Sequence, residues 1–276
     1  MNENRFVKAL RYFVLGLGAF AILSPIYILL TASFKNAEEF GRSSPVAFPQ
    51  NLLYIENFRQ VFEKGNLGLA YTNIGMITIM TIFVNVIIGT MAAYAIQRFE
   101  FKFKKIIIGA YTLALIIPGI TTQVATYQVV KYLGLTNTIF AMVVLHLGTD
   151  IIQLYVYMQY LNHIPRELDE AASVEGASYI RIYCAIIMPL LIPAIVTLTV
   201  IKIIGIYNDM FTPYLYMSSP RLAVVSTALM KFSRGISSQW NTLSAGILLV
   251  MSPIVLLYLF LQKYIMAGIV DGAVKA

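Results

Sequence analysis

Residues 12–34, YFVLGLGAFAILSPIYILLTASF, form an uncharged stretch that is long enough to cross a lipid bilayer. A helix needs about 20 apolar residues to span a hydrocarbon core about 30 Å thick. Five further apolar stretches follow along the chain. The whole sequence is 59% hydrophobic and 12% charged, whereas soluble domains carry about 25% charged residues. The sequence therefore predicts a polytopic membrane protein.

The fold class that we expect is all-α, because these runs are continuously apolar, whereas transmembrane strands alternate in polarity. The first stretch is too long for the hydrophobic region of a signal peptide, and we expect it to be a retained anchor. Residues 54–64 are expected to form a short amphipathic helix on the outer surface. The six predicted spans are Tyr12–Phe34, Tyr71–Gln97, Ile106–Val130, Thr138–Tyr160, Pro189–Asp209 and Thr242–Gln262.

Basic residues indicate the orientation of the chain. Lys and Arg are nearly twice as dense in segments 1–11, 98–105, 161–184 and 263–276 as in segments 35–70, 131–137 and 210–242. Cytoplasmic loops of membrane proteins carry this excess, so both termini are predicted to lie inside. The net charge of +7 is explained by topology, and we expect no nucleic-acid partner.

One predicted cytoplasmic segment, residues 161–188, is longer than the other loops on that side. Acidic residues at 167, 169 and 170 suit the positive end of a short helix. Gly176 is expected to end that helix in a left-handed conformation, and Ser178 is expected to cap a second one. The segment is either a solvated connector or a docking element for a cytoplasmic partner.

The spacing of residues in this segment resembles a known motif. Glu170-Ala171-Ala172, Gly176, Ile186 and Met188-Pro189 are similar to the E-A-A-x3-G-x9-I-x-L-P pattern. This is the EAA loop of permease subunits of binding-protein-dependent ABC importers, and only Met188 departs from the pattern. We refer to residues 161–188 as the EAA loop.

Two further stretches resemble the carbohydrate-uptake subfamily of the maltose-transporter type. Tyr207-Asn208-Asp209 with Pro213 is similar to its W-N-[DE]-x3-P segment, although Tyr207 replaces the usual Trp. The tail at residues 268–275 is similar to the C-terminal end of that subfamily.

The resemblance implies a type I ABC importer permease fold in a bacterial cytoplasmic membrane. Residues 71–265 would form the permease domain, preceded by a transmembrane helix and extracytoplasmic segment at 1–70 and followed by a cytoplasmic tail at 266–276. The chain would be a non-catalytic subunit without a cofactor, which agrees with the lack of a phosphate-binding loop of the G-x-x-x-x-G-K-[ST] type. Its implied partners are a second permease subunit, a cytoplasmic ABC ATPase dimer, an extracytoplasmic solute-binding protein, a sugar and membrane lipid.

Polar residues within spans are costly and are candidates for function. The six candidates for a substrate pathway are His146, Asp150, Lys202, Tyr207, Asn208 and Asp209. His146 and Asp150 are four residues apart and are expected on one face of the fourth span. These residues either line a path for a hydroxyl-rich solute or form a structural network, for example through an Asp150–Lys202 pair. Tyr207 is a candidate to stack on a sugar ring.

Other functions remain open at this point. The solute could be a polyamine or phosphate instead of a sugar. A secondary transporter could use His146 and Asp150 as a proton relay. An intramembrane enzyme would need paired groups, and Asp150 and Asp209 are expected at different depths. Cys184 has no partners at metal-ligand spacing and is interpreted as a packing residue.

Overall fold

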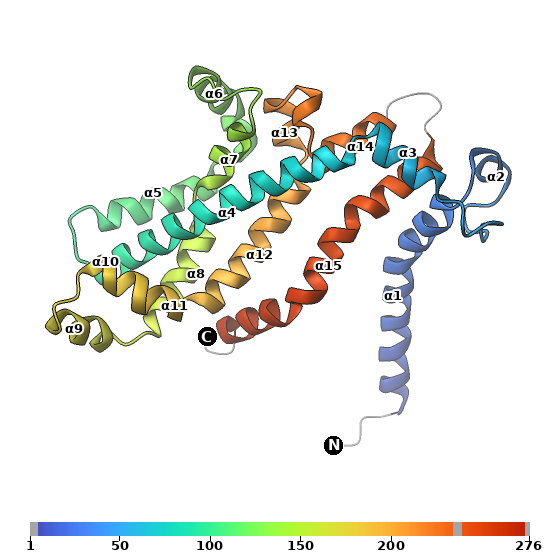
Figure 1. The fold of residues 1–276 in the computed structure, drawn as a ribbon. Coiled ribbons are helices and arrows are strands. Elements are labelled where there is room, and N and C mark those ends of the chain that lie inside the picture. The colour runs from blue at the N-terminus through green and yellow to red at the C-terminus, as the bar shows by residue number, and fades with distance from the viewer. Residues whose placement is uncertain (1–4, 234–238, 274–276) are drawn as a thin grey trace. The chain divides into compact units, whose positions relative to one another are not determined.

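A computed structural model describes residues 5–233 and 239–273 of the chain, without the side chains of 231, 233 and 263–273. All regular elements in these ranges are helical (Figure 1). Two compact units are formed, one by Met1–Gly68 with Val225–Val255 and one by Leu69–Val224 with Leu256–Ala276.

The first unit contains four helices and the start of a fifth. They are α1 (Arg5–Ser33), α2 (Ala37–Arg42), α3 (Glu56–Lys64), α14 (Val225–Ser233) and α15 (Trp240–Ala273), of which the part from residue 256 belongs to the second unit. The helix predicted at 54–64 forms as α3, which begins two residues later, at Glu56.

The second unit holds the EAA loop and the candidate pathway residues. Its elements are α4 (Leu67–Arg98), which begins at the boundary, α5 (Lys104–Ile116), α6 (Gly119–Tyr132), α7 (Ile139–Leu147), α8 (Ile151–Asn162), α9 (Glu167–Val174), α10 (Tyr179–Ile182), the π-helical turn η1 (Tyr183–Ile187), α11 (Met188–Leu190), α12 (Ile192–Asn208), α13 (Phe211–Tyr216) and the 3-10 turn η2 (Pro220–Leu222).

The predicted spans fall on helices of two kinds. Among the described residues, α1, α4 and residues 240–262 of α15 are each long and apolar enough to cross a membrane as one helix. The other three spans are bent helix pairs, with bends of 110° between α5 and α6, 49° between α7 and α8, and 74° between Tyr179–Leu190 and α12. Counting each bent pair as one span gives up to six.

Proline and glycine account for two of these bends. The third span is not one helix, as its apolar run had suggested, because Pro118 and Gly119 interrupt it between α5 and α6. The bend before α12 lies at Leu191, and Pro193 follows it within the first turn of α12. A proline ring lacks an N–H and clashes with the carbonyl four residues earlier, so helices kink there.

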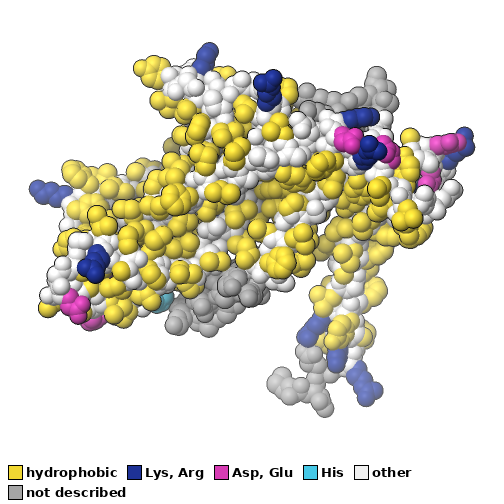
Figure 2. All heavy atoms as spheres, in the orientation of Figure 1, with side chains coloured by type: hydrophobic (Ala, Val, Ile, Leu, Met, Phe, Trp, Pro, Cys, Tyr) yellow, Lys and Arg dark blue, Asp and Glu magenta, His cyan; other side chains and the backbone are white. Residues whose placement is uncertain are grey.

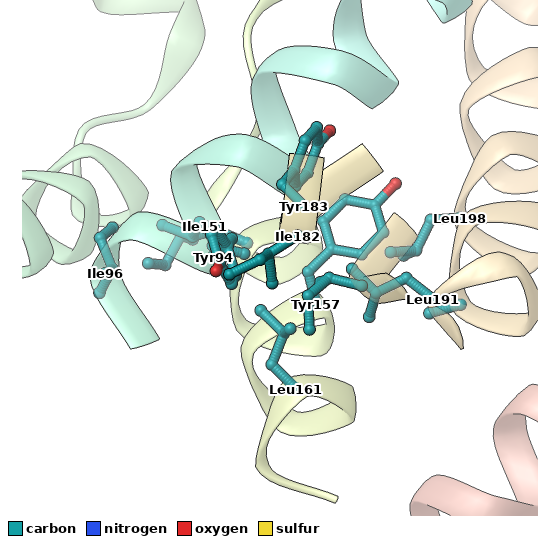
Figure 3. Close-up of a cluster of buried hydrophobic side chains, with 13 residues drawn as sticks. Tyr94, Ile96, Ile151, Tyr157, Leu161, Ile182, Tyr183, Leu191 and Leu198 are labelled. Carbon is teal, nitrogen blue, oxygen red and sulfur yellow. The ribbon is translucent and has the colours of Figure 1, made fainter. Parts of the chain in front are cut away.

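The core of the second unit lies where α4, α8, the α10–η1 segment and α12 meet (Figure 3). Tyr157 and Leu161 of α8 are fully buried in it, as are Ile187 and Leu191. The Tyr183 hydroxyl is 2.7 Å from Thr90 Oγ1 of α4, and both groups are buried. Since lipid is as apolar as these side chains, close packing and hydrogen bonds stabilise this cluster more than burial does.

Close packing requires a small residue on α4. A Cβ at Gly89 would lie 2.8 Å from Thr149 Oγ1 and 3.1 Å from Tyr157 Cε2. The glycine therefore lets the backbone of α4 approach α8, as small residues do between membrane helices.

The buried side chain of Asn57 connects several helices of the first unit. The Asn57 side chain donates to the backbone oxygens of Ser33 and Lys35 at 2.8 and 2.7 Å. Asn241 donates to the same Lys35 oxygen at 3.1 Å. These contacts join the end of α1 to α3 and α15.

Hydrophobic side chains cover much of the visible surface of the long helices, and charged side chains gather near helix ends and loops (Figure 2). Large exposed apolar residues such as Phe13, Phe83 and Ile116 lie within the predicted spans. This distribution suits helices that face lipid.

Candidate functional site

The EAA loop forms the two helices that the sequence predicted. α9 carries Glu167, Asp169 and Glu170 in its first turn, and it begins two residues after Pro165. Gly176 has a φ of +83°, which confirms the predicted left-handed conformation. The Ser178 side chain accepts from the Arg181 N–H and caps α10, also as predicted.

The turn at Gly176 has a well-defined hydrogen-bond pattern. The Gly176 N–H donates to the Ser173 oxygen and the Ala177 N–H to the Ala172 oxygen, both at 3.0 Å. This is a Schellman motif, in which a left-handed residue lets the chain satisfy the last carbonyls of a helix. Ala172 and Ala177 both pack against the core cluster, as does Ile186. The turn therefore fixes the direction in which α9 leaves the bundle.

The outward face of α9 is exposed in the part of the chain that the structure describes. Glu170 and Ala171 are exposed, and Val174 is 89% exposed. Small and acidic residues thus share α9 with two exposed apolar residues, Leu168 and Val174. This combination gives a protein partner a close approach and a charged rim.

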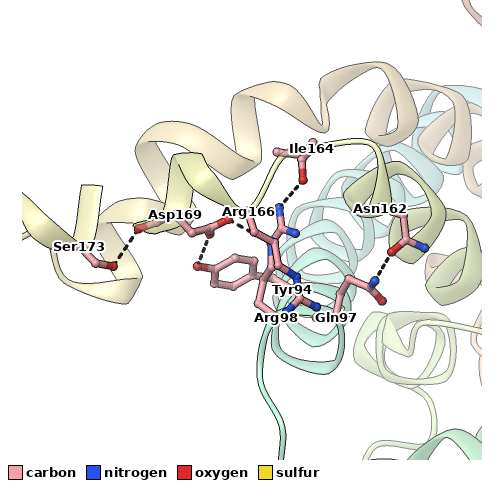
Figure 4. A network of polar contacts seen from close by, with 8 residues as sticks. All are labelled: Tyr94, Gln97, Arg98, Asn162, Ile164, Arg166, Asp169 and Ser173. Atoms are coloured by element: carbon pink, nitrogen blue, oxygen red, sulfur yellow. Dashed lines mark hydrogen bonds and ion pairs between the residues drawn. The ribbon is translucent and has the colours of Figure 1, made fainter. Parts of the chain in front are cut away.

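The inward face of α9 is tied to the end of α4 (Figure 4). Arg98 Nε lies 3.1 Å from Asp169 Oδ2, and these side chains are 7% and 16% exposed. Tyr94 donates from its hydroxyl to the other carboxylate oxygen at 3.0 Å. Arg98 also donates to the Ile164 backbone oxygen at 2.8 Å, and Arg166 donates to the Gln97 backbone oxygen at 3.1 Å.

A second ion pair lies just beyond α4. Lys104 Nζ is 2.8 Å from Glu100 Oε1. This hydrogen bond, with the charge of Lys104, holds the pKa of the Glu100 carboxyl below its ordinary value. Because Glu100 is exposed, the pair contributes little to stability.

The fifth span was predicted to begin at Pro189, directly after the EAA loop, but its straight part begins later. Helical structure runs from Tyr179 to Leu190 through the π-helical turn, and the chain then turns by 74° before α12. Pro189 itself is exposed. A movement of α9 that is transmitted along the chain must therefore change direction at this bend before it reaches α12.

Five of the six candidate pathway residues line one cavity of about 550 Å³ in the second unit. They are His146, Asp150, Lys202, Asn208 and Asp209. Apolar side chains, among them Leu198 and Ile201, complete the wall. The cavity combines hydrogen-bonding groups with an apolar surface. Such a wall can bind a solute that has both hydroxyl groups and an apolar face.

Tyr207 is the exception among the six candidates. It is buried and does not line the cavity. Its hydroxyl forms a hydrogen bond with Tyr71 of α4. In this structure it is therefore a contact between α12 and α4, and its role in stacking on a solute stays a prediction.

The polar pair in the cavity is not the one that the sequence suggested. His146 Nε2 lies 2.9 Å from Asp209 Oδ2, whereas no Asp150–Lys202 ion pair forms among the described residues. The Asp150 carboxylate instead accepts from the Gln153 N–H at 2.8 Å and caps α8. Lys202 Nζ reaches the Gly148 oxygen at 3.4 Å.

The expectation that His146 and Asp150 share one helix face was wrong. α7 ends at Leu147, and Gly148 and Asp150 have extended backbones. The four-residue spacing therefore does not place the two side chains on one face of a helix. Asp150 and Asp209 both line one cavity, and the expected difference in their depth stays a prediction.

Asn85 of α4 stabilises this break in the fourth span. Its amide donates to the backbone oxygens of Leu147 and Gly148 at 3.1 and 3.0 Å, and its own oxygen accepts from Gln153 at 2.6 Å. Non-helical backbone at membrane depth persists only where protein or water satisfies it. Asn85 does so from inside, because it is 1% exposed.

Asn85, Gln153 and the pairing of Arg98 with Asp169 were not predicted from the sequence. Asn85 and Gln153 are polar residues within apolar spans and Arg98 follows the end of one, whereas Asp169 had been assigned only to the acidic first turn of a helix. Nothing in the sequence shows which distant carbonyl or charge each of them contacts. No group of three His, Cys, Asp or Glu side chains within the described ranges is placed to hold a metal ion.

Comparison with known proteins places the chain in a family. Residues 4–270 match the family described as "Binding-protein-dependent transport system inner membrane component". The chain belongs to this family. It is therefore a multi-pass transport permease subunit of an inner membrane, and the resemblance drawn from the EAA loop is confirmed.

Curated relatives match over nearly their whole length. The melibiose/raffinose/stachyose import permease protein MelC of Bacillus subtilis (strain 168) is 31% identical over 253 residues, covering 91% of each chain. The probable starch degradation products transport system permease protein AmyC of Thermoanaerobacterium thermosulfurigenes is 32% identical over 254 residues, covering 92% of each.

A solved structure supports the fold. The crystal structure of a bacterial ABC transporter involved in the import of the acidic polysaccharide alginate matches with a TM-score of 0.86, covering 96% of this chain and 98% of that chain. The sequence identity is 17%, so this likeness concerns the fold alone. The predicted six-span, type I importer permease fold is confirmed, with three of the spans bent.

Proposed function

We propose that this chain is the permease subunit of an ATP-driven ABC importer that translocates a sugar or oligosaccharide across the cytoplasmic membrane. The observation that carries the proposal is the exposed helix α9, which ends in a left-handed Gly176 at the position that the EAA motif requires. The sugar class is supported by relatives that are named for melibiose, raffinose, stachyose and starch degradation products.

In this proposal, the chain supplies no catalytic group and a separate ABC ATPase dimer hydrolyses ATP. The ATPase binds the exposed face of α9 around Glu170 and Ala171 on the cytoplasmic side, and Gly176, Ile186 and Pro189 carry the loop back to the bundle. Closure of the ATPase moves α9, and the bundle changes between inward-facing and outward-facing states. Such rigid-body gating requires that ATP binding favour one state over the other.

The cavity of the second unit is the proposed part of the substrate pathway. Sugar hydroxyls would bind the hydrogen-bonding groups of Asp150, Lys202 and Asn208. His146 and Asp209 also line the cavity, and they are paired with each other. The apolar side chains contact the apolar face of a sugar ring. A second permease subunit in a heterodimer would form the other half of the path, and a solute-binding protein would deliver the sugar from outside.

The division of the chain also remains a proposal. Residues 1–70 provide an additional anchor and an extracytoplasmic segment, 71–265 the permease domain, and 266–276 a cytoplasmic tail. Residues 274–276 of that tail lie outside the described residues. The distribution of Lys and Arg supports a cytoplasmic location for both termini.

The test is purification of the complex from membranes through a tag on this chain, followed by identification of its subunits by mass. We expect an ABC ATPase, a second permease and a solute-binding protein. The binding protein is then screened by thermal shift with raffinose, stachyose, maltodextrins, spermidine and inorganic phosphate. Stabilisation by a saccharide alone supports the sugar assignment, whereas stabilisation by spermidine or phosphate alone refutes it. A chain that transports without any ATPase would be a secondary transporter.

A further inference from the structure

Helix α4 contacts both ends of the proposed machinery. At residues 94 and 98 it holds Asp169 of α9. Moving towards its N-terminus, Thr90 meets Tyr183 of η1. A further turn away, Asn85 holds the backbone of Leu147 and Gly148. These contacts lie on successive turns of one helix that has no proline within it.

The far end of this series reaches the cavity wall. Gly148, whose oxygen accepts from Asn85, also accepts from Lys202 at 3.4 Å. Gln153 lines the cavity and donates to Asn85. A shift of α4 along its axis would therefore move the backbone between the cavity residues His146 and Asp150, together with the Gly148 oxygen that Lys202 contacts.

The near end is a buried ionic contact. Arg98 and Asp169 are largely shielded from water, and the Tyr94 hydroxyl adds a hydrogen bond to the same carboxylate. Removing one member of such a pair leaves a buried charge unpaired, which is costly. Arg166 also faces this cluster, but it donates to the Gln97 oxygen and does not replace Arg98. α9 is thus fixed to α4 independently of the chain connection through α10.

We propose that Arg98 and Asp169 are positioning residues that transmit the movement of α9 to the cavity through α4. This route runs along one continuous helix, whereas the route through α10 and α12 turns by 74°. The inference rests on the proposed function, because it requires that an ATPase displace α9. It adds a second route by which a movement of α9 reaches the cavity, and it assigns a role to a pair outside the Glu170–Pro189 motif.

The test uses the complete complex in lipid nanodiscs, with Cys184→Ser as the background. A thiol reporter is introduced in the cavity wall by Ile201→Cys. The labelling rate of this thiol by a membrane-impermeant maleimide is measured without nucleotide and with ATP and vanadate. Three variants are compared, namely Asp169→Asn, the charge exchange Arg98→Asp with Asp169→Arg, and the control Glu167→Gln, which removes an exposed acid from the same helix.

We expect Asp169→Asn to retain the ATPase during purification and to reduce the nucleotide-dependent change in labelling about tenfold, because the neutral amide no longer forms an ion pair with Arg98. The charge exchange should restore most of the change, and Glu167→Gln should leave it intact. A response in Asp169→Asn equal to that of the control would overturn the proposal. So would loss of the ATPase from that variant, which would make Asp169 a docking contact, or no recovery in the charge exchange. If the unsubstituted complex contains no ATPase, the proposed function fails instead.

Discussion

Replacement of Gly176 tests the turn on which the orientation of α9 depends. Its φ of +83° is a conformation that L side chains rarely adopt, and a Cβ there would meet nothing within 4 Å. The cost of a substitution is therefore in the backbone alone. It is about 1–2 kcal/mol for Gly176→Ala, more for the β-branched Gly176→Val, and less for Gly176→Asn, because asparagine visits this region most readily after glycine.

A cost of this size changes the state of the turn. About 1–2 kcal/mol is a factor of 5–30 in a two-state population. The competing state loses the left-handed residue, and with it the two hydrogen bonds from Gly176 and Ala177 that end α9. α9 would then point away from its present direction and Ala172 and Ala177 would lose their contact with the core cluster, while the buried residues of that cluster, none of which lies in α9 or its turn, keep their packing with one another.

The assay is reconstituted complex in which ATP turnover and solute uptake are measured together. Uptake per ATP should fall in the order Gly, Asn, Ala, Val, with membrane insertion unchanged. Gly109→Val is the matched control, because Gly109 also has open space around its Cβ but lies in α5 without a positive φ. Coupling in Gly176→Val equal to that of Gly109→Val would refute the reasoning.

Three other substitutions test separate parts of the account. Glu170→Lys reverses an exposed charge on α9 and should lower the amount of ATPase that co-purifies, and an unchanged yield would count against the docking face. Gly89→Val forces a Cβ against Thr149 and Tyr157 and should lower the thermal unfolding midpoint, with an overpacking cost of about 1–3 kcal/mol, while an unchanged midpoint would contradict the close packing. Asn85→Leu leaves two carbonyl oxygens unsatisfied and should cost roughly 1–3 kcal/mol, measurable by the same unfolding assay. No loss of stability in Asn85→Leu would mean that water replaces the amide at the break.

Local features of the EAA loop were predictable because they depend on neighbouring residues. The acidic first turn, the left-handed Gly176 and the cap at Ser178 each require only a few consecutive positions. Span positions were predictable for the same reason, since an apolar run of sufficient length is a local property.

The cavity contacts were not predictable, because they join segments that are far apart in sequence. His146 and Asp209 are 63 positions apart, and the spacing of His146 and Asp150 was misleading once the helix broke between them. The helix break itself depends on a tertiary contact, because the Asn85 amide donates a hydrogen bond to a backbone carbonyl that has no helical partner there. The bend at Pro118 had a local signal, but apolar neighbours on both sides concealed it.

The most direct measurement of the central claim is site-specific cross-linking from α9. A thiol introduced by Ala171→Cys, in the Cys184→Ser background, lies on the exposed face that is assigned to the ATPase. In cells that are actively importing solute, a short thiol-specific cross-linker should capture an ATP-binding protein at this position. Failure to capture any ATPase under those conditions, while transport continues, would contradict the account.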